Sequence, residues 1–307
     1  MESLRQGEFI LMDGALGTEL ERRGVPFEGN GWSAYAVRDH GEVIRQTHVD
    51  YLQAGAKLHI VNSFALARHV LEPIGLAAEF EELNRRSVVL FDEAVERIGM
   101  DRGNLWVAGS LSTFAANSNR SLLPDNETLL VNYRDQARVL YDSGVDLFVL
   151  EMLFDIETTR VMLKAVEEFG LPVILGFTCD WQAGSGNSKV SARGMGKAPI
   201  LLREILPDLI VALGTADIIM SIMHSDPDVT DAALEELKQC WSGPVAVYPN
   251  SGEFVDLRMQ FDTVCSVESF QQAANRWIDG GVQIVGGCCG IGPEHIQGLS
   301  GPAAGRG

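Results

Sequence analysis

The sequence contains few basic residues for its length. Among 307 residues, 24 are Lys or Arg and 42 are Asp or Glu, which gives a formal net charge of −18 at pH 7. Nucleic-acid and anionic-membrane surfaces require Lys and Arg to neutralise phosphate groups. The composition therefore argues against a nucleic-acid partner and against binding to a membrane surface. It is compatible with an enzyme for small molecules, and a cationic substrate would not be repelled.

Long hydrophobic runs and a cysteine framework are also missing. The longest apolar runs span about eight residues, whereas a membrane-spanning helix needs about 20. The beginning of the chain, MESLRQGEFILMDG, has an early acid and no apolar stretch of signal-peptide length. Only five cysteines occur, an odd number that favours free thiols or metal ligands over disulfides. We therefore expect a cytoplasmic protein.

Eight short apolar runs alternate with longer helix-like segments along the whole chain. Most runs are continuous, which is typical of strands buried on both faces of a parallel sheet. The runs cover residues 9–16, 57–64, 105–112, 146–153, 172–180, 217–224, 244–251 and 282–289. Amphipathic patterns predict helices over 41–56, 76–99, 126–144 (capped by Asn126), 155–170, 228–241 and 266–281. This alternation predicts an α/β fold, a (β/α)8 barrel, with a doubly wound sheet as the alternative.

No Pro-rich or Ser-rich linker divides the chain. Residues 1–300 are therefore predicted to form a single barrel domain, and the Gly/Ala-rich residues 301–307 a flexible tail. The segment 181–196 is too polar and Gly-rich for a helix, so we predict a long loop after the fifth strand.

Polar and sulfur-containing side chains follow nearly all eight predicted strands. The active site of such a barrel lies at the C-terminal ends of its strands. In strand order, the residues at these ends are Asp13 and Gly14, Asn62 and Ser63, Ser110 and Ser112, Glu151, Thr178 and Cys179, His224, Asn250 and Glu253, and Cys288 and Cys289.

The segment GGCCG, residues 286–290, ends the last run with two adjacent cysteines. Neighbouring cysteines do not readily pair with each other, because a disulfide requires separations that they reach only with strain. Two thiolates suit zinc, which prefers nitrogen and sulfur ligands, and glycines allow the backbone to turn sharply. The pair therefore predicts a metal site at the mouth of the barrel, with two inert buried thiols as the alternative.

A series of segments resembles the homocysteine S-methyltransferase family, from about residue 9 to residue 299. They are MDGALGTEL (12–20), WSA (32–34), HVDYLQAGA (48–56), NSF (62–64), AGSL (108–111), SGVDLFVLEM (143–152), YPNSGE (248–253) and GGCCG (286–290). The resemblance implies a zinc barrel that binds homocysteine as its thiolate and methylates it to methionine. A small sulfonium or betaine-like donor is expected. Folate and cobalamin are not, because nothing beyond one barrel is present to bind them.

The resemblance also implies roles for individual residues. Cys288 and Cys289 are expected to be zinc ligands, and Glu151 to hold the amino group of homocysteine. Asp13 is expected to line the same pocket, and the remaining substrate-binding candidates are Gly14, Asn62, Ser63, Thr178, Asn250 and Glu253. Beyond the metal-activated thiolate of the substrate, no separate catalytic residue is expected.

The chain departs from the family at its third zinc ligand, a cysteine in a Gly-x-Asn-Cys segment at the end of the sixth strand. The corresponding segment reads IIMSIMHSDP (218–227), and the ligand position falls on Met223 or His224. Imidazole is a good zinc ligand and a thioether a poor one. Three hypotheses follow: His224 replaces the cysteine, Cys179 from the neighbouring strand does, or zinc is bound weakly, replaced by another metal, or lost.

The last hypothesis leads to an alternative function. A metal-poor paralog would bind a sulfur amino acid, or act on another thiol, without methylating homocysteine. The sequence is compatible with either a monomer or a homodimer, and the expected partners are small molecules only.

Overall fold

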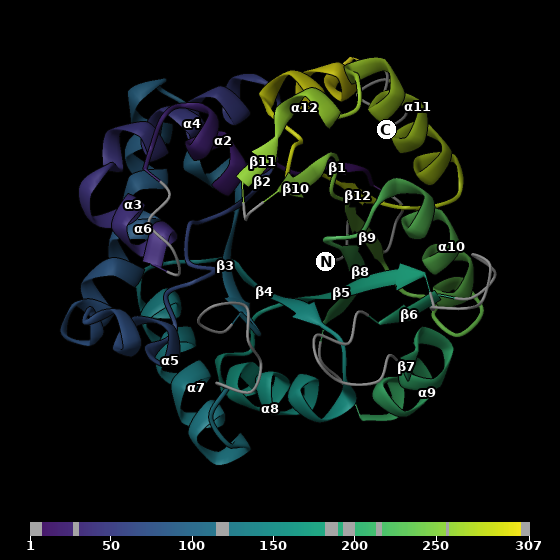
Figure 1. The fold of residues 1–307 in the computed structure, drawn as a ribbon, viewed down its shortest axis with the longest axis horizontal. Coiled ribbons are helices and arrows are strands. Elements are labelled where there is room, and N and C mark those ends of the chain that lie inside the picture. The colour runs from purple at the N-terminus through teal and green to yellow at the C-terminus, as the bar shows by residue number, and fades with distance from the viewer. Residues whose placement is uncertain are drawn as a thin grey trace.

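Eight parallel strands form a barrel around the centre of the molecule (Figure 1). This computed structural model describes residues 8–26, 31–114, 123–181, 190–192, 200–212, 217–255 and 258–301. The barrel strands are β1 (Ile10–Leu11), β2 (Leu58–Ile60), β3 (Trp106–Ser112), β4 (Leu147–Leu153), β5 (Val173–Trp181), β8 (Ile218–Met223), β9 (Val245–Tyr248) and β12 (Ile284–Val285). Their spatial order is β1-β12-β9-β8-β5-β4-β3-β2, and a parallel bridge between Met12 and Leu58 closes the ring. The predicted (β/α)8 barrel is confirmed.

The helices surround this barrel (Figure 1). They are α2 (Gly17–Arg22), α3 (Trp32–Asp39), α4 (Gly41–Gln53), α5 (Arg68–Leu71), α6 (Phe80–Arg97), α7 (Asn126–Asp142), α8 (Ile156–Val166), α9 (Leu202–Ala212), α10 (Pro227–Lys238), α11 (Val267–Asp279) and α12 (Pro293–Ser300). Asp125, rather than the predicted Asn126, caps α7, because its carboxylate accepts the backbone N–H of Thr128 at 2.8 Å. Within the described residues, none of the helices has the length and apolar character to cross a membrane.

The segment after β5 differs in part from the predicted loop. Residues of β6 (Val190–Ala192) pair antiparallel with the end of β5 and with β7 (Ile200–Leu201). The prediction of a loop was wrong for these three residues and for Trp181, the last residue of β5, because a polar, Gly-rich sequence can still extend a long strand as a hairpin. The rest of the predicted loop, 182–189 and 193–196, lies outside the described residues, as does 302–307 of the predicted tail.

The core has two layers, one inside the barrel and one between the strands and the helices. Inside the barrel pack Ile10, Met12, Leu58, Ile60, Ala108, Leu147, Val149, Ile174, Ile219, Met223, Ala246, Tyr248 and Ile284. A Cβ on Gly176 would overlap the side chain of Met223, so the glycine makes room for that methionine. Because the interior is filled, function is confined to the ends of the strands.

Candidate metal centre

An irregularity in β4 directs Glu151 to the mouth of the barrel. The pairing of β4 with β5 shifts register between Leu150 and Leu153. Met152, within this irregularity, has a φ of 58°, in the left-handed region that residues other than glycine seldom adopt. Such a bulge re-aims a side chain. The Glu151 side chain is buried, and its Oε1 accepts a hydrogen bond from the Ser110 hydroxyl of β3.

His224 follows the last residue of β8 and has a similar backbone conformation. Its φ is 53°, and its backbone N–H donates to the Tyr248 carbonyl oxygen at 3.0 Å. The imidazole lies between two other predicted site residues. Its Nε2 is 2.7 Å from Glu151 Oε2, and its Nδ1 is 3.2 Å from Cys288 Sγ. The side chain is 12% exposed, so the ring lies at the boundary between the barrel and its mouth.

The two adjacent cysteines complete this group. Cys288 Sγ lies 3.7 Å from Cys289 Sγ. In a tetrahedral zinc site with Zn–S near ~2.3 Å and Zn–N near ~2.0 Å, two sulfurs are about 3.8 Å apart, and sulfur and nitrogen about 3.6 Å apart. The distance from Cys288 Sγ to Cys289 Sγ matches the first value, and the distance from Cys288 Sγ to His224 Nδ1 is slightly shorter than the second. In donor type, the three side chains suit a Cys2His metal site that leaves a fourth position for a substrate, and Cys288 contacts both of the others.

A hydrogen bond couples the two thiols. The contact with Cys289, together with burial, raises the pKa of Cys288 well above its usual value. The same contact, in which the Cys288 thiol donates, lowers the pKa of Cys289. Cys289 is therefore the first of the pair to become the thiolate that a metal requires.

The neighbouring candidates for a third ligand are not at this position. Met223 is wholly buried inside the barrel, where it packs against Gly176. Cys179 is wholly buried on the opposite side of β5, in the layer between strands and helices. Of the three residues considered from the sequence, only His224 reaches the cysteine pair.

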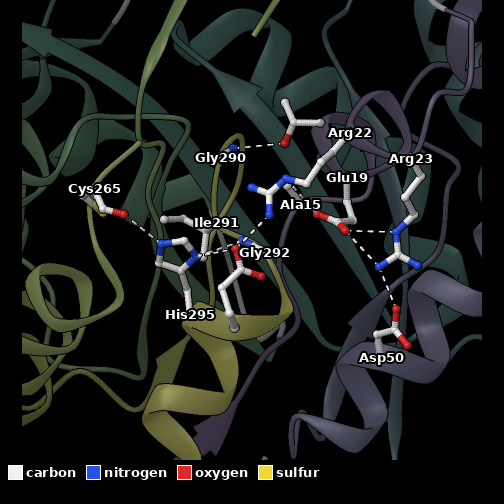
Figure 2. Close-up of polar contacts among 12 residues, drawn as sticks. Ala15, Glu19, Arg22, Arg23, Asp50, Cys265, Gly290, Ile291, Gly292 and His295 are labelled. Atoms are coloured by element: carbon white, nitrogen blue, oxygen red, sulfur yellow. Dashed lines mark hydrogen bonds and ion pairs between the residues drawn. The ribbon is translucent and has the colours of Figure 1, made fainter. Parts of the chain in front are cut away.

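The segment after the cysteine pair is fixed by the N-terminal part of the chain (Figure 2). The backbone N–H of Gly290 donates to Thr18 Oγ1 at 3.0 Å, and that of Ala15 to the Ile291 carbonyl oxygen at 3.0 Å. Gly290 has a φ of 83°, and a Cβ there would overlap the Ser251 carbonyl oxygen. The expected role of a glycine in turning this backbone is confirmed at Gly290.

Further hydrogen bonds anchor the start of α12 (Figure 2). The backbone N–H of Gly292 donates to His295 Nδ1 at 3.2 Å, and His295 Nε2 donates to the Cys265 carbonyl oxygen at 2.9 Å. Arg22 of α2 contacts Glu294 at 2.8 Å. Two distant parts of the sequence therefore hold the loop that carries the cysteines.

Asp13 is buried beside the same mouth. Its Oδ2 accepts the backbone N–H of Ile60 at 2.9 Å, and its Oδ1 accepts the hydroxyl of Tyr248 at 3.2 Å. Burial raises the pKa of Asp13 well above its usual value, against the effect of these hydrogen bonds. Tyr248 was not predicted as a site residue, although it opens the segment YPNSGE that carried part of the resemblance.

Two predicted pocket residues have buried polar atoms without a partner among the described residues. These atoms are Thr178 Oγ1 and Asn250 Oδ1. Buried polar atoms are nearly always hydrogen-bonded, so each is available to a ligand or a water molecule. Glu253 differs from them, because its side chain is exposed in β10 (Glu253–Val255), which pairs with β11 (Arg258–Gln260). The structure therefore places Glu253 outside the buried group.

Two other predicted residues make hydrogen bonds within the barrel, and a third is buried beside them. The hydroxyl of Ser63 donates to the Ser110 carbonyl oxygen and accepts its N–H, both at 2.9 Å, which joins the ends of β2 and β3. The Gly14 carbonyl oxygen accepts the Tyr248 hydroxyl at 2.8 Å. Asn62 is buried at the same end of β2.

The chain matches the model of one protein family over residues 10–301, described as homocysteine S-methyltransferase. The chain belongs to the homocysteine S-methyltransferase family. The selenocysteine methyltransferase of Astragalus bisulcatus is 28% identical over 95% of this chain and 92% of that protein. The homocysteine S-methyltransferase YbgG of Bacillus subtilis is also 28% identical, over 94% of this chain and 92% of its own.

The fold is shared with a solved member of this family. The metallated form of the homocysteine methyltransferase MmuM from Escherichia coli superposes with a TM-score of 0.77 at 25% identity, covering 97% of this chain and 98% of that one. The structural likeness is therefore to a methyltransferase that was solved with a metal bound.

The sequence did not single out two aromatic side chains near the imidazole: Phe64 lies beside its ring, and Phe114 lies beside Phe64. The rings of Phe64 and His224 have centroids 6.1 Å apart, and those of Phe64 and Phe114 are 5.5 Å apart. Phe64 belongs to the family segment NSF, which was the available signal. Aromatic faces attract cations, so these rings form one wall suited to an onium group.

A second group of ligand-type side chains lies next to β1 and β2. Asp13, His48 and His59 each offer an atom within 4.8 Å of the others, and all three are fully buried. Burial lowers the pKa of each histidine to about 3, so both are neutral. The group meets the distance requirement for a shared ion, but its donors include no thiolate, and the family segment GGCCG carries the cysteine pair. The cysteine-containing group is therefore the better candidate.

Proposed function

We propose that this protein is a zinc-dependent methyltransferase that methylates the sulfur of homocysteine or a close analogue. The donor would be a small sulfonium or betaine-like compound. The observation that carries the proposal is the placement of His224 Nδ1 3.2 Å from Cys288 Sγ, beside Cys289, on the barrel of a methyltransferase family. Selenocysteine and homocysteine are the acceptors named for the two relatives, and both present a soft nucleophile.

The metal would be held by Cys288, Cys289 and His224, with two sulfurs and one nitrogen as ligands. Zinc is favoured over harder ions because this donor set suits it. When bound, zinc lowers the pKa of a coordinated thiol, so that the acceptor sulfur is a nucleophile at neutral pH. The thiol proton is released to solvent.

The residues of the chain would bind and orient the two substrates. Thr178 Oγ1 and Asn250 Oδ1 are the buried polar atoms available to the polar end of the amino acid. Phe64 and Phe114 would face the positive donor. In the transfer, a new S–C bond forms while the methyl–onium bond breaks, and its electron pair remains on the neutral leaving group. Holding both reactants in line is the main contribution of the protein.

The first experiment measures bound zinc and methyl transfer in wild type, His224→Ala and Cys289→Ser. We expect about one zinc per chain in wild type, and loss of both zinc and methionine formation in each variant. Homocysteine would be tested with a sulfonium amino acid and with a betaine as donors. Zinc retained in His224→Ala would contradict the proposed ligand set.

A protein that binds homocysteine but neither zinc nor methyl donors would instead support the alternative of a metal-poor binding protein. The departure from the family cysteine at His224 is the observation that favours it. Four expectations remain predictions: that Glu151 binds the substrate amino group, that the protein is cytoplasmic, that residues 1–300 form a single domain, and that the protein is a monomer or a homodimer.

A further inference from the structure

Glu151 has an unusual set of partners for a residue expected to hold a substrate amino group. Its Oε1 accepts the Ser110 hydroxyl, and its Oε2 lies 2.7 Å from His224 Nε2. Both oxygens are therefore engaged within the protein. The side chain is 5% exposed, which leaves little of it to face a substrate.

The two contacts of the His224 ring define its chemistry. A neutral imidazole carries one N–H and one lone pair. With the N–H on Nε2 and donated to the Glu151 carboxylate, the lone pair of Nδ1 points toward Cys288 Sγ, at 3.2 Å. This is the tautomer that a metal ligand requires, and ligating histidines commonly donate their other N–H to a carboxylate.

Strained backbone lies at His224 and directly after Glu151. His224 and Met152, which follows Glu151, are the two non-glycine residues with positive φ in the described part of the chain. Left-handed conformations are strained for residues other than glycine and persist where the surroundings impose them. They occur here at the two strand ends that bring the carboxylate and the imidazole together.

We propose that Glu151 is a positioning residue of the metal centre, which accepts the N–H of His224 and holds its Nδ1 toward Cys288. The inference rests on the proposed zinc site. Glu151 would lose this role if a cysteine replaced His224, because a thiolate has no imidazole ring to orient. The carboxylate and the histidine therefore form a unit, supported by Ser110 from the next strand.

A double-mutant cycle on zinc affinity tests this coupling. Zinc affinity is measured by competition with a chromophoric chelator in wild type, Glu151→Gln, His224→Cys and the double variant. We expect Glu151→Gln to weaken zinc binding about 10–100-fold in the presence of His224. In the His224→Cys background the same change should alter affinity less than about threefold, because no imidazole remains to be oriented. An equal loss in both backgrounds, or none in wild type, would overturn the proposal.

Two further variants separate positioning from damage to the fold. Asp155→Asn neutralises another buried carboxylate, at the N-cap of α8 just beyond β4, and should leave zinc affinity unchanged. Ser110→Ala removes the other partner of Glu151 and should weaken zinc binding by less than Glu151→Gln does. If Glu151→Gln does not fold, the cycle is repeated with Ser110→Ala in the wild-type and His224→Cys backgrounds. The visible spectrum of bound Co²⁺ should change with Glu151→Gln only when His224 is present.

A substrate pair distinguishes the new role from the expected one. Homocysteine is compared with the same thiol lacking its amino group, 4-mercaptobutyrate. If Glu151 held the amino group, Glu151→Gln would raise KM for homocysteine alone and leave zinc affinity intact, which would overturn the inference. A wild-type protein without zinc would instead refute the proposed function itself, so the two failures are distinguishable.

Discussion

Replacing Gly290 by alanine tests whether the loop after the cysteine pair is built as described. The residue has a φ of 83°, and a Cβ would overlap the Ser251 carbonyl oxygen. A left-handed conformation costs an alanine about 1–2 kcal/mol. Relieving the overlap would also disturb two hydrogen bonds: Gly290 N–H to Thr18 Oγ1, at 3.0 Å, and Ser251 N–H to the Cys289 carbonyl oxygen, at 2.8 Å. At about 1 kcal/mol each, the total is about 3–4 kcal/mol.

Gly144→Ala supplies the matched control. Gly144 has a φ of 91°, and no atom of the described residues lies within 4 Å of the position its Cβ would take. It therefore carries the conformational cost without the overlap, and its expected loss is about 1–2 kcal/mol. The two variants should differ by about 2 kcal/mol.

Thermal unfolding in the presence of a chelator measures this difference without a contribution from metal binding. For a chain of this size, each kcal/mol corresponds to roughly 2 °C in Tm. Gly290→Ala should therefore unfold about 4 °C below Gly144→Ala, and should also bind zinc more weakly. Equal Tm values for the two variants would refute the steric account of Gly290.

Three other outcomes are expected. Gly176→Ala should destabilise the protein by about 1–3 kcal/mol in chemical unfolding, because its Cβ would overlap the side chain of Met223 in a filled core; wild-type stability would disprove this packing. Metal analysis should find about one zinc per chain in wild type and in a variant of the exposed Cys240, but none in Cys289→Ser; one ion left in Cys289→Ser would point to the group of buried histidines. The buried histidine His59 has a pKa lowered from 6.5 to about 3. The unfolded chain therefore binds more protons below about pH 6.5, and stability falls as the pH drops from there toward 3. Each such histidine contributes about 1.4 kcal/mol per pH unit. The loss of unfolding free energy between pH 7 and pH 5 should therefore be about 2 kcal/mol smaller in His59→Phe than in wild type.

The barrel could be predicted from the sequence because its signal is repeated. Each of the eight apolar runs becomes a strand of the parallel ring. The hairpin that includes Val190–Ala192 could not be predicted, since its pairing with β5 depends on a long-range contact rather than on local apolar character.

The site could be predicted only in outline. The sequence placed Cys288 and Cys289 at a strand end, where the pair predicted a metal site with two inert buried thiols as the alternative. It left Met223 and His224 as alternatives, because neighbouring residues on a strand differ only in which way they point. The positive φ of His224 decides between them, and this backbone conformation cannot be predicted from the residue type at that position. The sequence singled out Glu151 as a ligand of the substrate amino group. Its contact with the imidazole depends on the irregularity in β4.

The closure of the barrel has a consequence for the order in which the protein is made. Ile10 pairs with Ile284, and the cysteine loop is held by Thr18 and Ala15. During synthesis the first strand emerges early and waits for almost the entire chain before its partner appears. The proposed metal ligands therefore reach their final arrangement only in a completed barrel, and a prematurely ended chain would lack both the seam and the cysteine pair. If the proposed site binds zinc, a zinc-loaded molecule would therefore be one whose synthesis and folding are both complete.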